Sequence, residues 1–342
     1  MKLKLSSFKF NYTYVLLALL ALVFVLFSAT VGRTFLRVEV WLAMARQFPE
    51  FGVMTMAVML CFIIGKIDVS FVALGNFSAV VAILFVTQHL GLTEGMGATW
   101  LIILIALAIG ALCGFLNGTL ISRLNIPPIL ATLSTHMVFR GITVGVTGGH
   151  AVSGLPAEFA SMIRQTSILG LRAVPFLVFL AIFLFVAYLL KFTTFGKTLY
   201  MMGSNPKAVM FSAINTTKIT TLTFTLAGVI TTIGTILMVA GLNSSRADHG
   251  ASYLMRVILI LVLAGVLPIG GMGKVRNVLL AIVIIQVISS GVNMFPSLNV
   301  FYRELISAAL LLVVLVVTSI MLNSEDKKKK RKQREGKNPT PT

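Results

Sequence analysis

Charged residues are scarce in this chain, and acidic ones are the scarcest. Lysine, arginine, aspartate and glutamate make up 11% of the 342 residues, against roughly 25% in a soluble domain. So few charges, together with repeated apolar runs of about 20 residues, place the chain in a bilayer. Backbone groups there must be hydrogen-bonded internally, and the alternating strands of a barrel are absent, so the runs are expected to be helices. The sequence predicts an all-α integral membrane protein.

Residues that carry enzyme chemistry or hold metal ions form no recognisable arrangement. The two cysteines, Cys61 and Cys113, lie inside apolar runs without CxxC spacing, which predicts small packing residues rather than a disulfide or a zinc site. No HExxH or paired-carboxylate motif is present. The run Gly-Gly-Met-Gly-Lys-Val at 270–275 lacks the first glycine and the Ser or Thr of a phosphate-binding P-loop. We therefore expect no catalytic residues, no metal site and no cofactor.

Positive charge is plentiful, and its position along the chain predicts topology. The formal net charge is +18, yet eight basic residues lie between Lys327 and Lys337 and most others flank apolar runs. This distribution is typical of a cytoplasmic membrane face whose tail lysines lie against anionic lipid. No nucleic-acid recognition motif accompanies it, so we expect no nucleic-acid partner.

Ten apolar runs are candidate membrane spans, and an even number places both termini on one side. If that side is cytoplasmic it holds nineteen basic residues, including every lysine. The second and eighth runs are short, so an eight-span arrangement is the alternative. We expect a bundle of about ten transmembrane helices in the inner (cytoplasmic) cell membrane over residues 1–322, and a disordered basic cytoplasmic tail over 323–342. The runs are Tyr14–Thr30, Phe51–Ile64, Val69–His89, Thr99–Ser122, Ile129–Thr147, Val174–Lys191, Thr220–Gly241, Tyr253–Leu267, Val278–Asn293 and Leu305–Leu322.

Glycine spacing and a few ionisable side chains mark the interior of the spans. Asp68 fits either an ion relay or, as we favour, a cap at the start of the third span. His136 and Arg140 share one face of the fifth span and either line a water path or satisfy carbonyl groups. Two sets of glycines at four-residue spacing predict close helix packing in lipid: Gly110, Gly114 and Gly118, then Gly141, Gly145 and Gly149.

The segment Phe195–Ile219 is basic and half polar although it separates two apolar runs. Asn205 is placed to cap a helix that begins at Pro206, where a missing N–H has no cost. Small apolar residues follow at helical spacing from Ala208 to Ile214. A good cap and so much exposed apolar surface favour a short helix that docks in a groove of another protein over a plain surface loop.

Four blocks in the correct order resemble the permease subunits of ribose-type sugar ABC importers, the group that also carries galactofuranose and autoinducer-2. The resemblance covers about residues 51–317. It implies that the segment 195–219 holds a coupling helix, which fits a cleft on a separate ATP-hydrolysing subunit. It also implies a second permease copy or a related permease, and a solute-binding protein at the outer face. The blocks are Gly65–Val72, Gly114–Leu133 with Arg140-Gly141, Thr194–Ile214 and Ala264–Gly273.

The resemblance also points to individual residues. For coupling to the ATPase these are Gly196, Lys197, Gly203, Asn205, Pro206, Ala208, Ser212, Ala213 and Ile214. For the pathway or for helix packing they are Asp68, Gly114, Asn117, Gly118, Thr132, His136 and Arg140. The chain departs from the family pattern where Lys66 and Ala213 replace glycines, where Lys197 replaces an arginine, and where Leu254 and Arg256 replace an acidic pair. The departures leave open which solute is carried and whether the permease pairs with itself.

The predicted function is that of a permease subunit for a sugar or a similar small polar solute, such as a nucleoside or autoinducer-2. Its motion would be driven by ATP bound on a separate subunit. A proton-coupled secondary transporter is one alternative, but it would need membrane acids and an inverted repeat, neither of which is clear. A membrane assembly factor without transport activity is the other, and it need not depend on an ATPase.

Overall fold

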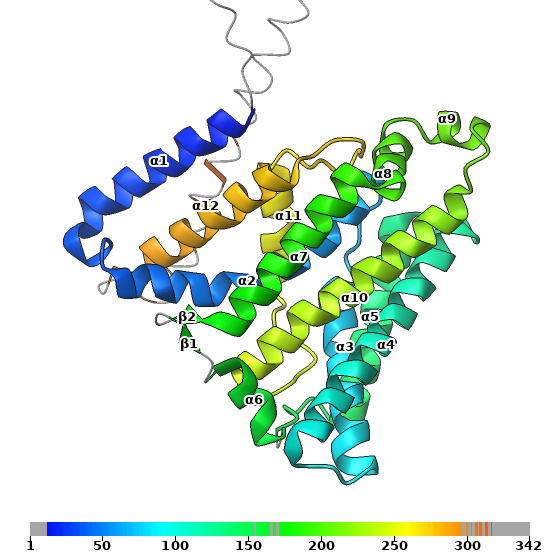
Figure 1. Ribbon diagram of the computed structural model, residues 1–342, viewed down its shortest axis with the longest axis horizontal. Helices are drawn as coiled ribbons and strands as arrows, with labels where there is room; N and C mark the ends of the chain where they lie inside the picture. The colour runs from blue at the N-terminus through cyan, green and yellow to red at the C-terminus, as the bar shows by residue number, and fades with distance from the viewer. Residues whose placement is uncertain are drawn as a thin grey trace, which may run out of the picture. The chain divides into compact units, whose positions relative to one another are not determined.

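The computed structural model describes residues 12–153, 155–164, 167–168 and 171–295, with a few single residues between 299 and 316. Within them only β1 (Ser167–Ile168) and β2 (Leu171–Arg172) are strands, paired antiparallel, and the other named elements are helices (Figure 1). The all-α fold class is confirmed. The chain divides into a large unit, Val38–Ile282, and a small unit, Met1–Arg37 with Val283–Thr342.

The helices follow one another with short connections. They are α1 (Tyr12–Val31), the 3-10 turn η1 (Gly32–Thr34), α2 (Val38–Ile63), α3 (Phe71–Leu84), the π turn η2 (Phe85–His89), α4 (Gly95–Ser122), α5 (Pro128–Thr147), α6 (Ala157–Arg164), α7 (Ala173–Phe192), α8 (Thr194–Ser204), α9 (Pro206–Phe211), α10 (Thr216–Leu242), α11 (Tyr253–Leu263) and α12 (Val275–Asn293).

Seven helices of the described part are long and apolar enough to cross a membrane, which makes the chain a multi-pass membrane protein. They are α1 with η1, α3 with η2, α4, α5, α7, α10 and α12. Of the predicted last span, Leu305–Leu322, the structure describes only scattered residues as far as Val316, and the predicted tail 323–342 lies entirely outside the described residues.

The second helix differs from its predicted limits. The sequence predicts a short span from Phe51, whereas α2 begins at Val38 and has 26 residues. The apolar run on which the prediction was based ends at the polar residues that precede Phe51. Polar side chains do not interrupt a helix, and α2 continues through them. Even Pro49 lies within the helix. All thirteen residues from Phe51 to Ile63 are buried, so this half of α2 forms the core of the large unit.

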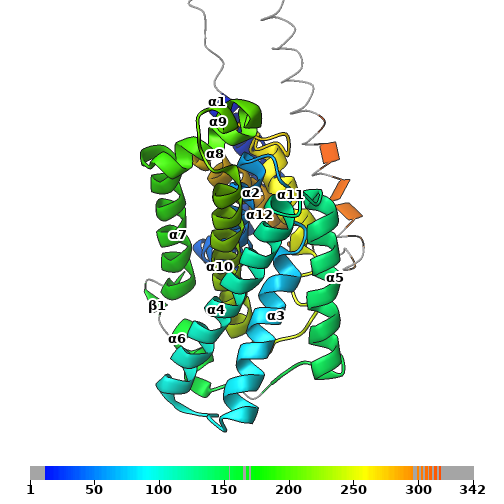
Figure 2. The same ribbon diagram turned by 90° about the vertical axis from the view of Figure 1, so that its right-hand side faces the viewer.

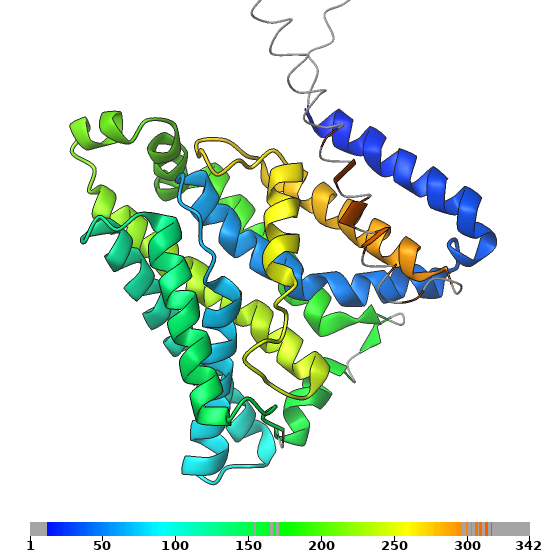
Figure 3. The ribbon, with the colours of Figure 1, turned by 180° about the vertical axis from the view of Figure 1, so that it is seen from behind.

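The eighth predicted run, Tyr253–Leu267, is only partly helical. At 1.5 Å per residue, the eleven residues of α11 extend about 16 Å, far less than the roughly 30 Å of a bilayer core. The irregular segment 264–274 links α11 to α12 and lies beside the end of α2 (Figure 3). Tyr253 donates to Glu50 at 3.0 Å, and the N–H of Gly271 reaches the carbonyl of Ile63 at 2.8 Å.

The glycine triplet of α4 packs against α10. A Cβ added at Gly118 would lie 2.7 Å from the Cα of Thr221, and one at Gly228 would lie 3.1 Å from the Cα of Gly114. Close packing by this triplet is therefore confirmed. For the other triplet the same expectation is wrong within the described chain, because a Cβ at Gly141 or Gly145 would meet nothing within 4 Å.

In the small unit, aromatic rings pack around the turn that follows α1. The ring of Phe35 lies 5.7 Å from that of Phe24 and 5.9 Å from that of Phe27. A Cβ added at Gly291 of α12 would lie 2.6 Å from the Phe27 ring. The glycine therefore lets the ring sit directly on the helix backbone.

The long helix α10 extends from one end of the large unit to the other. Four residues separate the end of α9 from the start of this helix, and its 27 residues extend about 40 Å at 1.5 Å per residue. Figure 2 shows α8 and α9 at one end of α10 and α6 at the other. We call these the α8–α9 end and the α6 end.

Candidate functional site

Three side-chain caps shape the turns at the α8–α9 end. The Thr193 hydroxyl accepts from the N–H of Gly196 at 3.1 Å, before α8. Asn205 accepts from Ala208 N–H at 3.1 Å, with Pro206 as the first residue of α9, as the sequence predicts. Asn215 accepts from Lys218 N–H at 2.9 Å and starts α10. Each cap satisfies a backbone donor that would otherwise lack a partner at a helix start.

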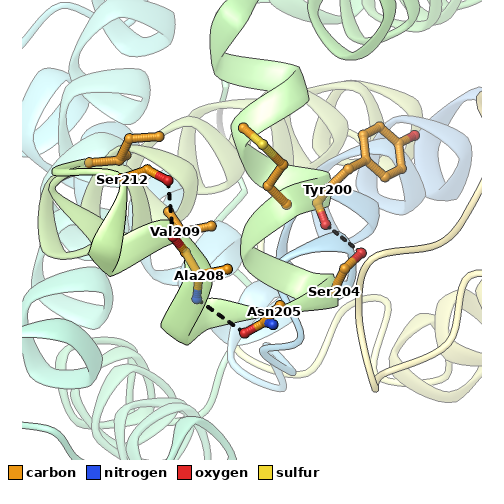
Figure 4. A pocket seen from close by; sticks show the side chains of 8 residues that line it. Tyr200, Ser204, Asn205, Ala208, Val209 and Ser212 are labelled. Carbon is orange, nitrogen blue, oxygen red and sulfur yellow. Dashed lines mark hydrogen bonds between the residues drawn. The ribbon is translucent and has the colours of Figure 1, made fainter.

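A pocket of about 310 Å³ lies between α8 and α9 (Figure 4). Its walls include Tyr200, Ser204, Ala208, Val209 and Ser212. The hydroxyls of Ser204 and Ser212 donate to the carbonyls of Tyr200 and Ala208, at 2.9 and 3.0 Å. With these hydroxyls turned to the backbone, the pocket offers a mostly apolar surface.

The predicted coupling residues divide into two groups. Gly196 and Gly203 pack against other backbone, the first on Leu189 and Leu190 of α7. The others line or border the pocket or lie on the surface: Lys197, Asn205, Pro206, Ala208, Ser212 and Ala213 are exposed, and Ile214 is half-buried. Ala213 has a φ of 57°, a left-handed conformation that suits glycine better than alanine.

Gly203 stands where three segments meet. A Cβ at this position would collide with the carbonyl oxygen of Ile63 and the N–H of Gly271. Gly65 and Gly270 also touch, because a Cβ at Gly270 would lie 2.8 Å from the Cα of Gly65. The Tyr200 hydroxyl, whose pKa is raised by burial, donates to the carbonyl of Gly273 at 2.8 Å. The segments 64–70, 200–204 and 264–274 thus form one junction, which we call the glycine junction.

Large apolar side chains project at the same end. Phe211 at the end of α9 is 91% exposed and Met210 is 64% exposed. Ile269, in the segment 264–274, is 79% exposed. None of these three residues belongs to one of the seven long apolar helices. Exposed apolar patches of this kind are often contact surfaces in proteins.

The structure brings together three of the predicted pathway or packing residues. Asp68 accepts from the N–H and the hydroxyl of Ser70, at 2.8 and 2.7 Å, just before α3 begins. Asn117 of α4 donates to the same hydroxyl at 2.8 Å. The Thr132 hydroxyl of α5 accepts from Val69 N–H at 3.2 Å. The start of α3 is thereby tied to α4 and α5.

Burial raises the pKa of Asp68 above its ordinary value, and the two hydrogen bonds from Ser70 oppose the shift. His136 is half-buried on α5, and Arg140, one turn on, is exposed. Neither side chain is hydrogen-bonded to Asp68. Asp68 bonds to Ser70, the residue before α3, and its role as a relay or as a helix cap stays a prediction.

Sequence reasoning missed Ile63 and the contacts among the glycines of the glycine junction. The Gly-Gly-Met-Gly run at 270–273 was a possible signal, but it was rejected as a phosphate-binding loop and otherwise used only as part of the family resemblance. In the structure it follows a helix rather than a strand and packs on Gly65 and Gly203. Within the described residues no group of three or more His, Cys, Asp or Glu could hold a metal ion.

A family model described as a branched-chain amino acid transport system permease component matches residues 40–315. The chain belongs to this family of ABC importer permeases. Members are transport components rather than enzymes, and they work with an ATP-hydrolysing subunit and a solute-binding protein. The permease therefore belongs to the membrane part of an importer of the autoinducer-2 and sugar transport family, energised by ATP hydrolysis on another subunit.

Several curated proteins are similar to the permease. The autoinducer 2 import system permease protein LsrD of Yersinia enterocolitica is 30% identical over 309 residues, which is 88% of this chain and 90% of that protein. The proteins of the same name from Yersinia pseudotuberculosis and Yersinia pestis are 30% and 29% identical over the same lengths. No solved structure matches the chain.

Proposed function

We propose that the permease moves a sugar or a similar small polar solute, such as a nucleoside or autoinducer-2, and that the ATP-hydrolysing subunit docks at the α8–α9 end. The observation that carries the docking proposal is Phe211, an almost fully exposed aromatic side chain on a capped helix outside the spans. Exposed aromatic anchors beside a small pocket are typical of interfaces with high binding energy.

The link from docking helix to pathway is short. α9 is followed by the Asn215 cap, and α10 begins at the next residue. On its other side, α9 follows α8 directly, and α8 reaches the glycine junction through Gly203. The backbones touch directly there, without intervening side chains. A displacement of α8 would therefore be passed on to α2 and to the segment 264–274 with little loss.

The proposed topology is a permease domain over residues 1–322 with about ten crossings and both termini cytoplasmic, followed by a basic tail over 323–342. The seven apolar helices are supplemented by α2, by α11 with the segment 264–274, and by the apolar run at 305–322. An even number puts the termini on the side of the α8–α9 end, where the positive-inside rule expects the lysines. The tail lysines would lie against anionic lipid.

The proposed assembly contains a second permease copy or a related permease, an ATP-hydrolysing subunit at the α8–α9 end and an extracytoplasmic solute-binding protein at the α6 end. Alternating access would arise when ATP binding displaces the docked helix and the packed helices follow as rigid bodies.

The test places a charge in the docking surface. Ala208→Asp adds a carboxylate to the pocket wall, and Ala213→Asp adds one at a left-handed position that aspartate tolerates. Burying an unpaired charge should reduce ATPase affinity about a hundredfold or more, while the spans stay intact. We expect uptake and ATPase co-purification to fall together with membrane abundance unchanged. Normal uptake and co-purification in both variants would contradict the proposal.

A further inference from the structure

The loop between α10 and α11, residues 243–252, packs into the helix bundle instead of lying on its surface. Ser245 is fully buried and Ala247 is 7% exposed. The loop follows the last residue of α10, so the length of that helix, about 40 Å at 1.5 Å per residue, separates it from the α8–α9 end. We call it the outer loop, because the proposed topology places this end of α10 outside the cell.

Hydrogen bonds from two directions hold the outer loop. The side-chain amide of Asn76, on α3, donates to the carbonyls of Ala247 and His249 at 3.2 and 2.8 Å. Ser245 exchanges backbone hydrogen bonds of 2.8 and 3.0 Å with Val152, in the connection between α5 and α6. Asn76 is only 1% exposed, so this side chain grips the loop from inside the bundle.

Three polar atoms at this contact are buried and have no hydrogen-bond partner among the described residues. They are Oδ1 of Asn76, the hydroxyl oxygen of Ser245 and Nδ1 of His249. A buried polar atom without a partner is unfavourable, whereas contact with water would satisfy all three. The hydrogen bonds from Asn76 and Val152 therefore favour the packed loop, and the unpartnered atoms favour a loop that is open to water.

We propose that the outer loop is a gate at the outer mouth of the solute pathway and that Asn76 is the residue that holds it shut. The proposal rests on the proposed function, which places the loop at the outer face. Asn76 is a positioning residue, because it acts through the two loop carbonyls. When its hydrogen bonds break, the three unpartnered atoms become hydrated, so opening exchanges one set of hydrogen bonds for another.

The helix α10 connects the outer loop to the docking helix. Its first residue follows the Asn215 cap, and the loop begins directly after its last residue, Leu242. Asn76 belongs to a different helix, α3. A displacement of α10 by the docked ATP-hydrolysing subunit therefore moves the start of the loop against α3, and it strains the Asn76 hydrogen bonds.

The first experiment labels a cysteine in the outer loop with a charged, membrane-impermeant thiol reagent, in intact cells that contain the complete importer. Ser245→Cys is the reporter, since its hydroxyl has no partner among the described residues and its side chain is buried. Thr93→Cys, in the exposed loop between η2 and α4, is the accessible control. The native cysteines, Cys61 and Cys113, are buried, so the parent chain gives the background.

Asn76→Leu roughly keeps the volume of the side chain and removes both donors. Ser78→Ala is the matched control, because Ser78 is buried on the same helix and its hydroxyl donates to the carbonyl of Leu74 in that helix. We expect slow labelling of the Ser245→Cys reporter, labelling about tenfold faster when Asn76→Leu is added, and no change with Ser78→Ala at equal membrane abundance. Fast labelling without Asn76→Leu would show that the loop is not shut, and would overturn the proposal.

The second experiment locks the loop and leaves Asn76 unaltered. Residues that exchange both backbone hydrogen bonds in an antiparallel pair have Cα atoms about 5.5 Å apart, a separation that a disulfide spans. Val152→Cys combined with Ser245→Cys should therefore form a disulfide on mild oxidation. We expect oxidation to lower ATP turnover by the purified complete importer about tenfold, and dithiothreitol to restore it. The two single-cysteine variants are the controls and should keep their turnover.

The outcomes separate this proposal from the proposed function. Equal labelling of the Ser245→Cys reporter with and without Asn76→Leu, or unchanged ATP turnover in the oxidised double variant, would contradict the gate alone. A complete importer that does not hydrolyse ATP, or Thr93→Cys that is labelled only after the cells are broken open, would contradict the proposed function and topology.

Discussion

The backbone N–H of Gly271 donates a 2.8 Å hydrogen bond to the carbonyl oxygen of Ile63, the last residue of α2. Carbonyls at a helix C-terminus have no partner within the helix, so this bond satisfies one of them while joining two segments about 200 residues apart. Gly203 lies against both atoms. The connection leaves no room for a side chain from α8.

Gly203→Ala should therefore destabilise the protein although alanine is the better helix former. Overpacking typically costs about 1–3 kcal/mol, which exceeds the roughly 1 kcal/mol gained from helix propensity. Thermal unfolding in detergent gives the measurement. The control is Gly97→Ala in α4, where a Cβ would meet nothing within 4 Å. Equal melting temperatures for the two variants would show that the glycine junction accommodates an added methyl group without cost.

Gly114→Leu should disrupt the contact between α4 and α10. A Cβ at Gly114 would already lie 3.0 Å from the carbonyl carbon of Phe224, and a leucine is far larger. We expect a loss of several kcal/mol and low membrane abundance. Gly145→Leu, on a surface that contacts nothing within 4 Å, is the matched control and should accumulate normally. Abundance is measured by immunoblot of membrane fractions.

Phe211→Ala should weaken ATPase docking without affecting the fold. A truncated aromatic hot spot costs about 2 kcal/mol or more, or about a thirtyfold loss of affinity. Co-purification of the ATPase at graded concentrations measures it. Phe192→Ala, at an exposed phenylalanine that ends the apolar helix α7, should leave docking unchanged. A Phe211 variant that binds like wild type would remove the main support for docking at α9.

Ala213→Gly should be tolerated and should slightly stabilise the turn after α9. Alanine at a φ of 57° carries about 1–2 kcal/mol of strain, which glycine relieves at a smaller entropic cost. Uptake should remain at the wild-type level. The melting temperature in detergent should be equal or higher, and a clear fall would show that the alanine side chain makes a stabilising contact.

Asp68→Asn should change how stability depends on pH. Burial raises the pKa of Asp68 above 3.8, so above that pH the folded state binds more protons than the unfolded state. Wild-type stability therefore falls as pH rises from 3.8 through the folded pKa. Asparagine does not ionise, and its oxygen still accepts from Ser70. Between about pH 4 and about pH 7 the variant should lose less stability than wild type.

The control for this prediction has the opposite sign. The hydrogen bond from Arg246 lowers the pKa of Asp248, so its small contribution to stability is lost as pH falls. Melting temperatures of wild type, Asp68→Asn and Asp248→Asn at about pH 3, about pH 4 and about pH 7 make the comparison, because the Asp248 contribution is lost below its ordinary pKa of 3.8. Parallel pH profiles for wild type and Asp68→Asn would contradict the prediction, because they would show that folding does not raise the pKa of Asp68.

Most of the helices could be predicted because apolar runs of span length have few alternatives in a bilayer. The Asn205 cap could be predicted too, since it depends only on neighbouring residues. The start of α2 and the end of α11 could not, because polar residues within α2 and the irregular backbone after α11 are held by tertiary contacts, such as Tyr253 with Glu50, that the local sequence does not reveal. The roles of the predicted coupling and pathway residues stay predictions.

The crossing of α4 and α10 has a mechanical consequence. Gly114 and Gly228 meet close to the midpoint of α10, so the longest arm on either side is about 20 Å. The two backbones touch there with no side chain between them, so this contact is the natural pivot for a rigid tilt of α10. A tilt of about ten degrees would move its two tips by about 3–4 Å in opposite directions. A tilt of α10 that narrows the helix bundle at one end would therefore widen it at the other end.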